Sequence, residues 1–293
     1  MEKELEAFIK KVKKQESALF DYEKKKNALH TKQSLANGHT DDHRIAELKS
    51  MGIDTASILK SFVKSEKDLK ADHKVYITSA QDFAVDLGDL FFAPPPIIRD
   101  PNVVYILPPA VDGYGGNFFD DEDCGFNLAL GETNFKASEQ GSGWGLSGGP
   151  YGKTGESTLV FSFNPPRSGN ILVEPNIDFR GVFAISANDH SYTSTHAFLN
   201  LKVSSKLYQH YWETGPENTI LDESHRESSN SGVINQRVRL AYSASVSDND
   251  PVRVFIKLRL DIGAKSSHAR ADIDFRTGAT RFIRVPFIKV TYI

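Results

Sequence analysis

The fold is decided by the stretch from Ser157 to Val203, which has the sequence STLVFSFNPPRSGNILVEPNIDFRGVFAISANDHSYTSTHAFLNLKV. Large apolar residues alternate with other residues at its start, where Leu159, Phe161 and Phe163 stand two apart. A spacing of two is typical of a β-strand whose two faces differ. The alternation returns after each interruption by Pro, Gly, Asn or Asp, so we predict strand, turn, strand, turn, strand, loop and strand.

The alternation continues to the C-terminus. Residues 252–261 place Val, Val, Ile, Leu and Leu on one face, and Arg, Phe, Lys, Arg and Asp on the other. The segment from Glu213 to Ser231 is rich in Glu, Asp, Ser and Asn, and we expect it to be a surface loop. In the last strand, Pro286 is expected at an edge or a bulge. Together these patterns predict an antiparallel two-sheet β-sandwich of jelly-roll type.

The N-terminal part of the chain has a different pattern. No Pro or Gly occurs from Glu2 to Leu35, and Asn37-Gly38 then interrupts the chain before a second helical pattern that ends near Asp72. The first segment carries apolar residues at three- and four-residue steps, namely Leu5, Phe8, Val12, Leu19, Tyr22 and Leu29. We predict a mainly β protein with an N-terminal α-helical hairpin or coiled-coil-like region at residues 1–74, an extended Pro-rich connection at 75–110 and the sandwich at 111–293.

Composition limits the classes of function. The chain has 293 residues and a formal net charge of -3, whereas a nucleic-acid-binding protein normally has a stronger basic bias, so we expect no nucleic-acid partner. No apolar run has the roughly 20 residues of a membrane-spanning helix, and the charged N-terminus is unlike a signal peptide. We therefore expect a cytoplasmic protein or one exported by a non-classical route. The single cysteine, Cys124, excludes an internal disulfide and is expected to be an unreactive loop residue.

The segment from Ala110 to Gly155 is the least regular part of the chain, and long loops often carry function. Its candidate ligand-binding residues are the aromatic side chains Tyr114, Trp144 and Tyr151. Trp144 can equally fill the edge of the core. The acidic run that contains Asp120, Asp121 and Asp123 offers oxygen ligands for calcium, but consecutive acids cannot all face one ion, so we favour a solvated loop and expect no cofactor.

A second group of candidates lies at the other ends of the strands. Asp189, His190 and Tyr192 occupy a predicted loop, and Tyr211 and Trp212 end a predicted long strand. Aromatic side chains in loops can stack on a sugar, and polar neighbours can orient it.

These features favour a non-enzymatic interaction protein, in which the sandwich binds a protein partner or a glycan and the helices serve as a stalk or oligomerisation element. Two alternatives stay open. One is a membrane-active, pore-forming protein of toxin type, because the Ser- and Thr-rich segments from Ser191 to Ser205 and from Ser231 to Ser247 could pair as a transmembrane hairpin. The other is a carbohydrate-acting enzyme that uses Asp120, Asp121 or Asp123.

Overall fold

The computed structural model describes residues 7–12, 14–15, 18, 25, 41–60, 63–64, 67, 71, 100–117, 124–141, 152–188, 194–248, 250–266, 268–278 and 280–293. Strands dominate this part of the chain. They are β1 (Val103–Ile106), β2 (Asp112–Asn117), β3 (Cys124–Asn127), β4 (Glu132–Gln140), β5 (Gly152–Phe163), β6 (Gly169–Ala187), β7 (His196–Tyr208), β8 (Trp212–His225), β9 (Ser229–Arg239), β10 (Tyr242–Val246), β11 (Val252–Lys265), β12 (Ala269–Asp274) and β13 (Phe282–Tyr292).

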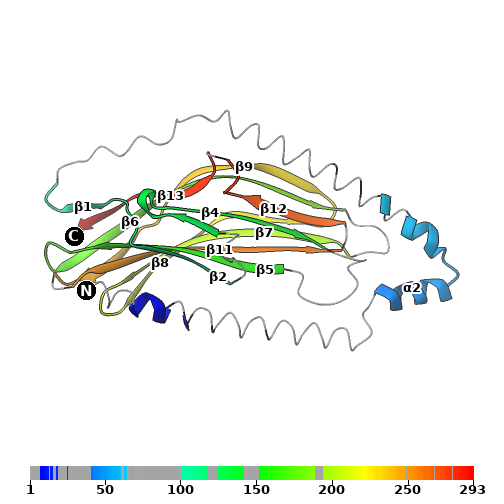
Figure 1. Ribbon diagram of the computed structural model, residues 1–293, viewed down its shortest axis with the longest axis horizontal. Helices are drawn as coiled ribbons and strands as arrows, with labels where there is room; N and C mark the ends of the chain where they lie inside the picture. Colours follow the sequence, from blue (N-terminus) through cyan, green and yellow to red (C-terminus); the bar gives the residue numbers. More distant parts are fainter. Residues whose placement is uncertain are drawn as a thin grey trace.

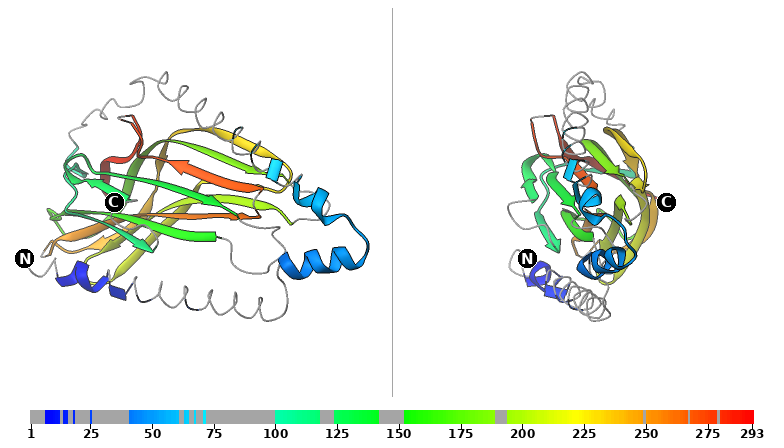
Figure 2. Two further views of the ribbon diagram at one scale, coloured as in Figure 1. Left: turned by 45° about the vertical axis from the view of Figure 1, so that its right-hand side comes forward. Right: turned by 90° about the vertical axis from the view of Figure 1, so that its right-hand side faces the viewer.

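The strands form two antiparallel sheets that pack face to face, which confirms the predicted sandwich (Figures 1 and 2). Sheet A has eight strands in the order β1-β13-β4-β12-β6-β10, with β3 beside β4 and β9 beside β6. Sheet B has five strands in the order β2-β5-β11-β7-β8. Strand β1 pairs with β13, so the sandwich includes residues that precede position 111.

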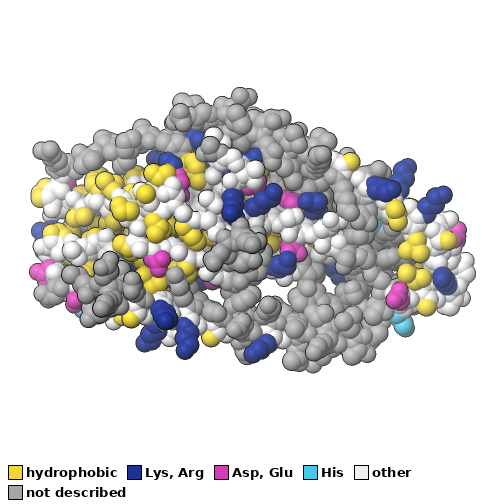
Figure 3. Space-filling model, in the orientation of Figure 1, with side chains coloured by type: hydrophobic (Ala, Val, Ile, Leu, Met, Phe, Trp, Pro, Cys, Tyr) yellow, Lys and Arg dark blue, Asp and Glu magenta, His cyan; other side chains and the backbone are white. Residues whose placement is uncertain are grey.

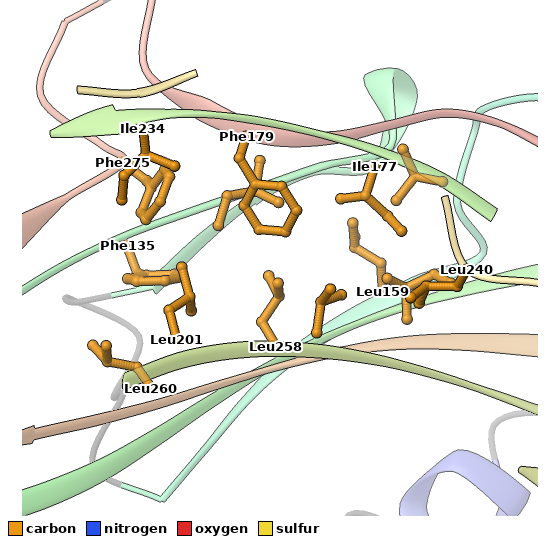
Figure 4. Close-up of a cluster of buried hydrophobic side chains, with 14 of the residues drawn as sticks. Phe135, Leu159, Ile177, Phe179, Leu201, Ile234, Leu240, Leu258, Leu260 and Phe275 are labelled. Atoms are coloured by element: carbon orange, nitrogen blue, oxygen red, sulfur yellow. The ribbon is translucent and has the colours of Figure 1, made fainter. Parts of the chain in front are cut away.

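The core lies between the two sheets and follows directly from the alternation in the sequence. Inward-pointing residues of both sheets meet in one large cluster, and Figure 4 shows Phe179 and Phe275 from sheet A facing Leu201 and Leu258 from sheet B. The rings of Phe135 and Phe275 have centroids 5.2 Å apart. Burial of side chains of this size contributes about 1.5–3 kcal/mol each relative to exposure, which makes this cluster the main source of stability.

Strand β6 is longer than the sequence suggested. The second turn predicted within the stretch from Ser157 to Val203 is wrong, because a single strand runs from Gly169 through Pro175 to Ala187. Pro175 has no N–H to donate, but it sits where the neighbouring strand changes from β10 to β9, and its carbonyl accepts a hydrogen bond from Leu240 N at 3.0 Å. The absence of an N–H group at Pro175 therefore does not interrupt the hydrogen bonds between the strands.

The polar segment from Glu213 to Ser231 is also different from the prediction. It forms β8 and the start of β9 instead of a loop. Strand β8 lies at the edge of sheet B and has exposed or half-exposed side chains along its whole length, so polar residues suit it as well as they suit a loop. Cys124 is likewise in strand β3 and is buried, whereas we expected it in a loop.

The expected helical hairpin is only partly covered by the described residues. Residues 7–12 are helical, α2 spans Asp41–Ser50, and residues 55–60 are helical again. Leu48 packs with Ile45, Ile53 and Ile58 in a small cluster separate from the sandwich core. The rest of the predicted hairpin and the Pro-rich segment up to position 99 lie outside the described residues, so the three-part division of the chain stays a prediction.

The surface is uneven in character. In the view of Figure 3, hydrophobic side chains gather toward one end of the molecule, and Lys, Arg, Asp and Glu side chains lie together nearer its middle.

Among the described helices, none has the length and apolar character needed to cross a membrane. The two segments considered for a transmembrane hairpin fall in different sheets, because β7 belongs to sheet B whereas β9 and β10 belong to sheet A.

Candidate functional site

The outer face of sheet B is formed by side chains that point away from the core. In β11 the even-numbered residues from position 252 to 260 are buried in the core, so Phe255 and Lys257 point outward. The antiparallel register places Val160 and Lys206 on either side of Phe255, and it places Thr158 beside Lys257. An apolar centre with polar neighbours therefore lies in the middle of this face.

The edge strands extend the same face. On one side, β2 places Tyr114 opposite Thr158. On the other side, β8 places Trp212 opposite Tyr208 and Thr214 opposite Lys206. The register of five strands therefore brings Tyr114 and Trp212 onto one face, although they are distant in the sequence.

Four aromatic rings meet on this face, and we call them the aromatic cluster: Phe8, Tyr208, Trp212 and Phe255. The centroid of the Trp212 ring lies 5.0 Å from those of both Tyr208 and Phe255. Phe8 comes from helical residues 7–12 and stacks on Tyr208 at a centroid distance of 4.3 Å. Phe255 is buried beneath these rings, whereas Trp212 remains 43% exposed. Phe255 therefore forms the buried base of the aromatic cluster, and Trp212 remains accessible at its side.

A hollow of about 230 Å³ opens beside the aromatic cluster, between sheet B and the N-terminal residues. We call it the aromatic groove. Its lining residues are Val12, Gln15, Tyr114, Thr158, Lys206, Trp212, Thr214, Phe255 and Lys257. The volume is below the range of about 300–1,000 Å³ that is usual for drug-sized ligands, so the groove suits a small unit such as one sugar ring.

The groove combines ring surfaces with hydrogen-bonding groups. Tyr114, Trp212 and Phe255 supply the rings, while threonine, glutamine and lysine side chains supply donors and acceptors. Lys257 forms an ion pair with Glu156 at 2.7 Å, which fixes its ammonium group in place. Lys206 is exposed. The described residues of the lining include no aspartate or glutamate.

Two of the residues predicted from the sequence meet in this groove, namely Tyr114 and Trp212. Tyr211 is adjacent to Trp212 and 51% exposed, but it is not among the lining residues. The other candidate ligand-binding residues lie outside the described residues: Trp144, Tyr151, Asp189, His190 and Tyr192. The same holds for the weak metal candidates Asp120, Asp121 and Asp123.

Seven described lining residues of the groove were not predicted from the sequence, among them Lys206, Phe255 and Lys257. The contribution of Phe8 to the aromatic cluster was not predicted either. One signal was available, because Phe255 is the apolar exception on the otherwise polar face of its strand. An apolar residue on a solvent face is expected to be covered by another element. The narrow apolar stripe of the N-terminal helix predicts that it packs on the sandwich or on a copy of itself, but it does not indicate which strands the helix covers.

A second polar cluster lies at the turn between β8 and β9. His225 Nδ1 is 2.6 Å from Ser228 Oγ, and His225 Nε2 is 2.6 Å from Glu223 Oε2. Asn230 Nδ2 donates to Glu223 Oε1 at 2.9 Å. The order serine, histidine, carboxylate is that of a hydrolase triad, but none of these residues lines the aromatic groove. We interpret these hydrogen bonds as structural contacts that stabilise the hairpin of β8 and β9.

His196 lies close to this polar cluster, on the neighbouring strand β7. Its Nε2 is 2.8 Å from Ser224 Oγ. Burial, followed by the charges of Arg226 and Lys265, lowers the pKa of His196 below 6.5. The ring is therefore neutral at pH 7 and adds no positive charge to this edge of sheet B. Among the described residues, no three His, Cys, Asp or Glu side chains are grouped to hold a metal ion.

Comparison with known proteins gives no family for the chain. No family model matches it, and no curated protein matches it. Among solved structures, it is similar to TmCBM61 in complex with β-1,4-galactotriose, with a TM-score of 0.23 and 11% identity over 63% of this chain and 95% of that chain.

Two further solved structures show a similarity of the same order. One is Xyl-CBM35 in complex with a glucuronic acid-containing disaccharide, with a TM-score of 0.19 and 12% identity over 52% of this chain and 76% of that one. The other is a family 35 carbohydrate-binding module from Clostridium thermocellum, with a TM-score of 0.19 and 11% identity over 65% of this chain and 99% of that one. Similarity at this level carries no conclusion about the function of this chain.

Proposed function

We propose that this protein is an interaction protein that binds a glycan in the aromatic groove of sheet B. The observation that carries the proposal is the convergence of Tyr114, Trp212 and Phe255 on one small hollow with a polar rim. A sugar ring presents apolar C–H faces and hydroxyl groups at its edge. Aromatic faces and surrounding donors and acceptors match both features.

Binding suits this groove better than catalysis. Among the described residues that line it there is no aspartate or glutamate, and the neighbouring carboxylate of Glu156 is paired with Lys257. Glycoside hydrolysis uses a pair of carboxylates, which these described residues do not supply. The polar groups of the described lining can instead orient hydroxyls, which serves affinity and selectivity.

The test begins with the full chain on a glycan array that includes neutral and acidic oligosaccharides. Binding of the best ligand is then measured by calorimetry for the unchanged protein and for Trp212→Ala and Tyr211→Ala. Loss of the stacking ring in Trp212→Ala should weaken binding about 30-fold, which corresponds to about 2 kcal/mol. Tyr211→Ala is the matched control, because Tyr211 is exposed and adjacent but does not line the groove, and it should bind normally.

Two results would contradict the proposal. The first is an array on which the folded protein retains no glycan. The second is an equal loss of affinity in Trp212→Ala and Tyr211→Ala, because the groove would then have no special part in binding. Thermal unfolding and near-ultraviolet circular dichroism of each variant establish that the comparison is made between folded proteins.

A further inference from the structure

The outer face of sheet A carries a second concentration of functional groups, far more charged than the groove. Its acidic side chains come from three strands and are all nearly buried, with 3–9% exposure: Glu132, Glu174, Asp178, Asp272 and Asp274. Each of them contacts at least one lysine or arginine. Negative charge on this face therefore lies beneath the surface and is neutralised there.

The positive side chains are more numerous and mostly more exposed. Eight described cations belong to this face, seven of them in strands and Arg281 directly before β13: Lys136, Arg180, Arg237, Arg239, Arg270, Arg281, Arg284 and Lys289. Eight cations and five acids give a net charge of +3, whereas the whole chain has -3. A partner that approaches this face meets arginine and lysine groups, and the rest of the molecule carries the excess of negative charge.

Ion pairs hold six of these cations in fixed positions, namely Arg237, Arg239, Arg270, Arg281, Arg284 and Lys289. Arg270 donates from Nε to Asp272 Oδ2 at 2.7 Å and from Nη2 to Asp272 Oδ1 at 3.2 Å. Arg237 makes the same kind of paired contact with Asp178, with an Nη2–Oδ2 distance of 2.9 Å. A guanidinium has five N–H donors, and Asp272 engages two of those on Arg270. Within the described part of the chain, the other donors of Arg270 are thus left for an anionic ligand.

A hollow of about 240 Å³ lies within this face and gives one anionic group a place to bind. Arg270 and Lys136 both line it, together with the hydroxyl of Ser138. The carboxylates of Asp272 and Asp274 also line it, and they are paired with Arg270 and Arg281 respectively. Its apolar lining includes the short side chains of Val182 and Ala184, which leave room above β6. Lys136 is exposed and has no ion-pair partner within the described part of the chain.

We propose that the outer face of sheet A binds an acidic polysaccharide, with one carboxylate or sulfate group in the hollow between Lys136 and Arg270. A sheet face with cations on several strands fits an extended, linear, anionic chain. Arginine and lysine groups supply charge-assisted hydrogen bonds to its carboxylates or sulfates. This site is distinct from the aromatic groove, which lies on the opposite sheet.

The chemistry of this face favours a polysaccharide over a nucleic acid. Proteins that bind single-stranded nucleic acid usually offer exposed aromatic rings on which bases stack. Two aromatic rings of β13, Phe282 and Phe287, are only 9% and 7% exposed. Arg284 and Arg180 cover Phe282, with guanidinium carbons 4.4 Å and 5.8 Å from its centroid. Phe282 thus positions arginines and is not available to a base.

The test measures binding of the full chain to polygalacturonate, a linear carboxylate polymer, at low and high salt. The double variant Lys136→Gln/Arg239→Gln removes two exposed charges and keeps the fold, because Glu174 retains Lys289 at 3.3 Å when Arg239 is lost. We expect binding to weaken about tenfold in the double variant and to fall steeply with salt. The matched control is Lys49→Gln/Lys60→Gln, which makes the same change in net charge on exposed helical positions and should bind normally.

Several outcomes would overturn the assignment. They are absence of binding to polygalacturonate at low salt, equal losses in the double variant and its control, and equal affinity for single-stranded DNA or for vesicles of anionic lipid. Trp212→Ala separates this proposal from the previous one, because loss of the groove tryptophan should leave polygalacturonate binding unchanged. Dextran, which is uncharged, should not bind to this face.

Discussion

The ring of Phe8 stacks on the ring of Tyr208 with a centroid distance of 4.3 Å and an interplanar angle of 22°. A residue near the start of the chain therefore covers strand β7 in the middle of the sequence. Ile9, which follows Phe8, is only 5% exposed and packs in the same cluster with Tyr114, Val160 and Phe255. The N-terminal helix is thus part of the wall of the aromatic groove.

Replacement of Phe8 should weaken the packing of the N-terminal helix on sheet B. Phe8→Ala removes one ring from the aromatic cluster, and loss of a half-buried ring of this kind should lower the free energy of unfolding by about 1–3 kcal/mol. The same change should expose Trp212 to water and shift its fluorescence to longer wavelength. The measurement is chemical denaturation followed by tryptophan emission, in a Trp144→Phe background so that Trp212 alone reports.

The control for this experiment is Leu59→Ala, a large-to-small change at a side chain that is 39% exposed. It should alter neither the unfolding midpoint nor the emission of Trp212. If Phe8→Ala behaves like Leu59→Ala, the contact between the N-terminal helix and sheet B does not contribute to the folded state, and the wall of the groove has to be reconsidered.

The sandwich was predictable because its core obeys a period of two over long stretches. Strand β11 illustrates this, since Val252, Val254 and Ile256 are buried while Arg253 between them is not. The prediction was wrong at β8, where the polar sequence of an edge strand resembles that of a loop. Hydrogen bonds to β7 decide the outcome there, and these are set by tertiary pairing, which composition does not encode.

The candidate site was predictable only in part. Tyr114 and Trp212 were identified as aromatic residues near strand ends, but their meeting depends on the order β2-β5-β11-β7-β8. Strand order places β2 at one edge and β8 at the other, with three strands between them. A single sequence gives the residues on each face, whereas the order of the strands determines which of those residues become neighbours.

Gly181 lies at a position in β6 where no side chain fits. A Cβ added there would come within 2.5 Å of the Phe275 ring and 2.9 Å of the Asp274 carbonyl oxygen. Phe275 is completely buried, so it has no free space into which to move. Gly181→Ala should therefore lower the free energy of unfolding by about 1–3 kcal/mol, as overpacking of a core usually does.

Gly116→Ala in β2 is the matched control for Gly181→Ala. The nearest atom to a Cβ at that position is the Glu156 Cβ, at 3.7 Å, which is ordinary van der Waals contact. Both changes add one methyl group to a strand glycine, so the intrinsic preference for a strand changes equally. Denaturation of the two variants side by side should show a loss for Gly181→Ala alone, and similar stabilities would contradict the close packing of Phe275 on β6.

The ion pair between Asp274 and Arg281 predicts how stability depends on pH. Burial raises the pKa of Asp274, but N–H groups of Thr277 and Arg276 and the charge of Arg281 outweigh it, so the pKa lies below 3.8. Because the pKa is lower in the folded state, the stabilisation is complete above about pH 4. It is lost as the pH falls through the folded-state value, since the unfolded chain then binds the proton more readily.

The variant Asp274→Asn tests this relationship. The neutral amide would leave the Arg281 guanidinium, which is 2.6 Å from the Asp274 carboxylate, without its counter-charge, and the free energy of unfolding at pH 7 should fall by about 3–5 kcal/mol. The stability difference between Asp274→Asn and the unchanged protein should shrink as the pH is lowered below 4. The exposed carboxylate of Asp250 provides the control, because Asp250→Asn should change stability by less than about 1 kcal/mol at either pH. A difference for Asp274→Asn that stays constant down to pH 2 would show that the charge of this carboxylate does not stabilise the turn after β12.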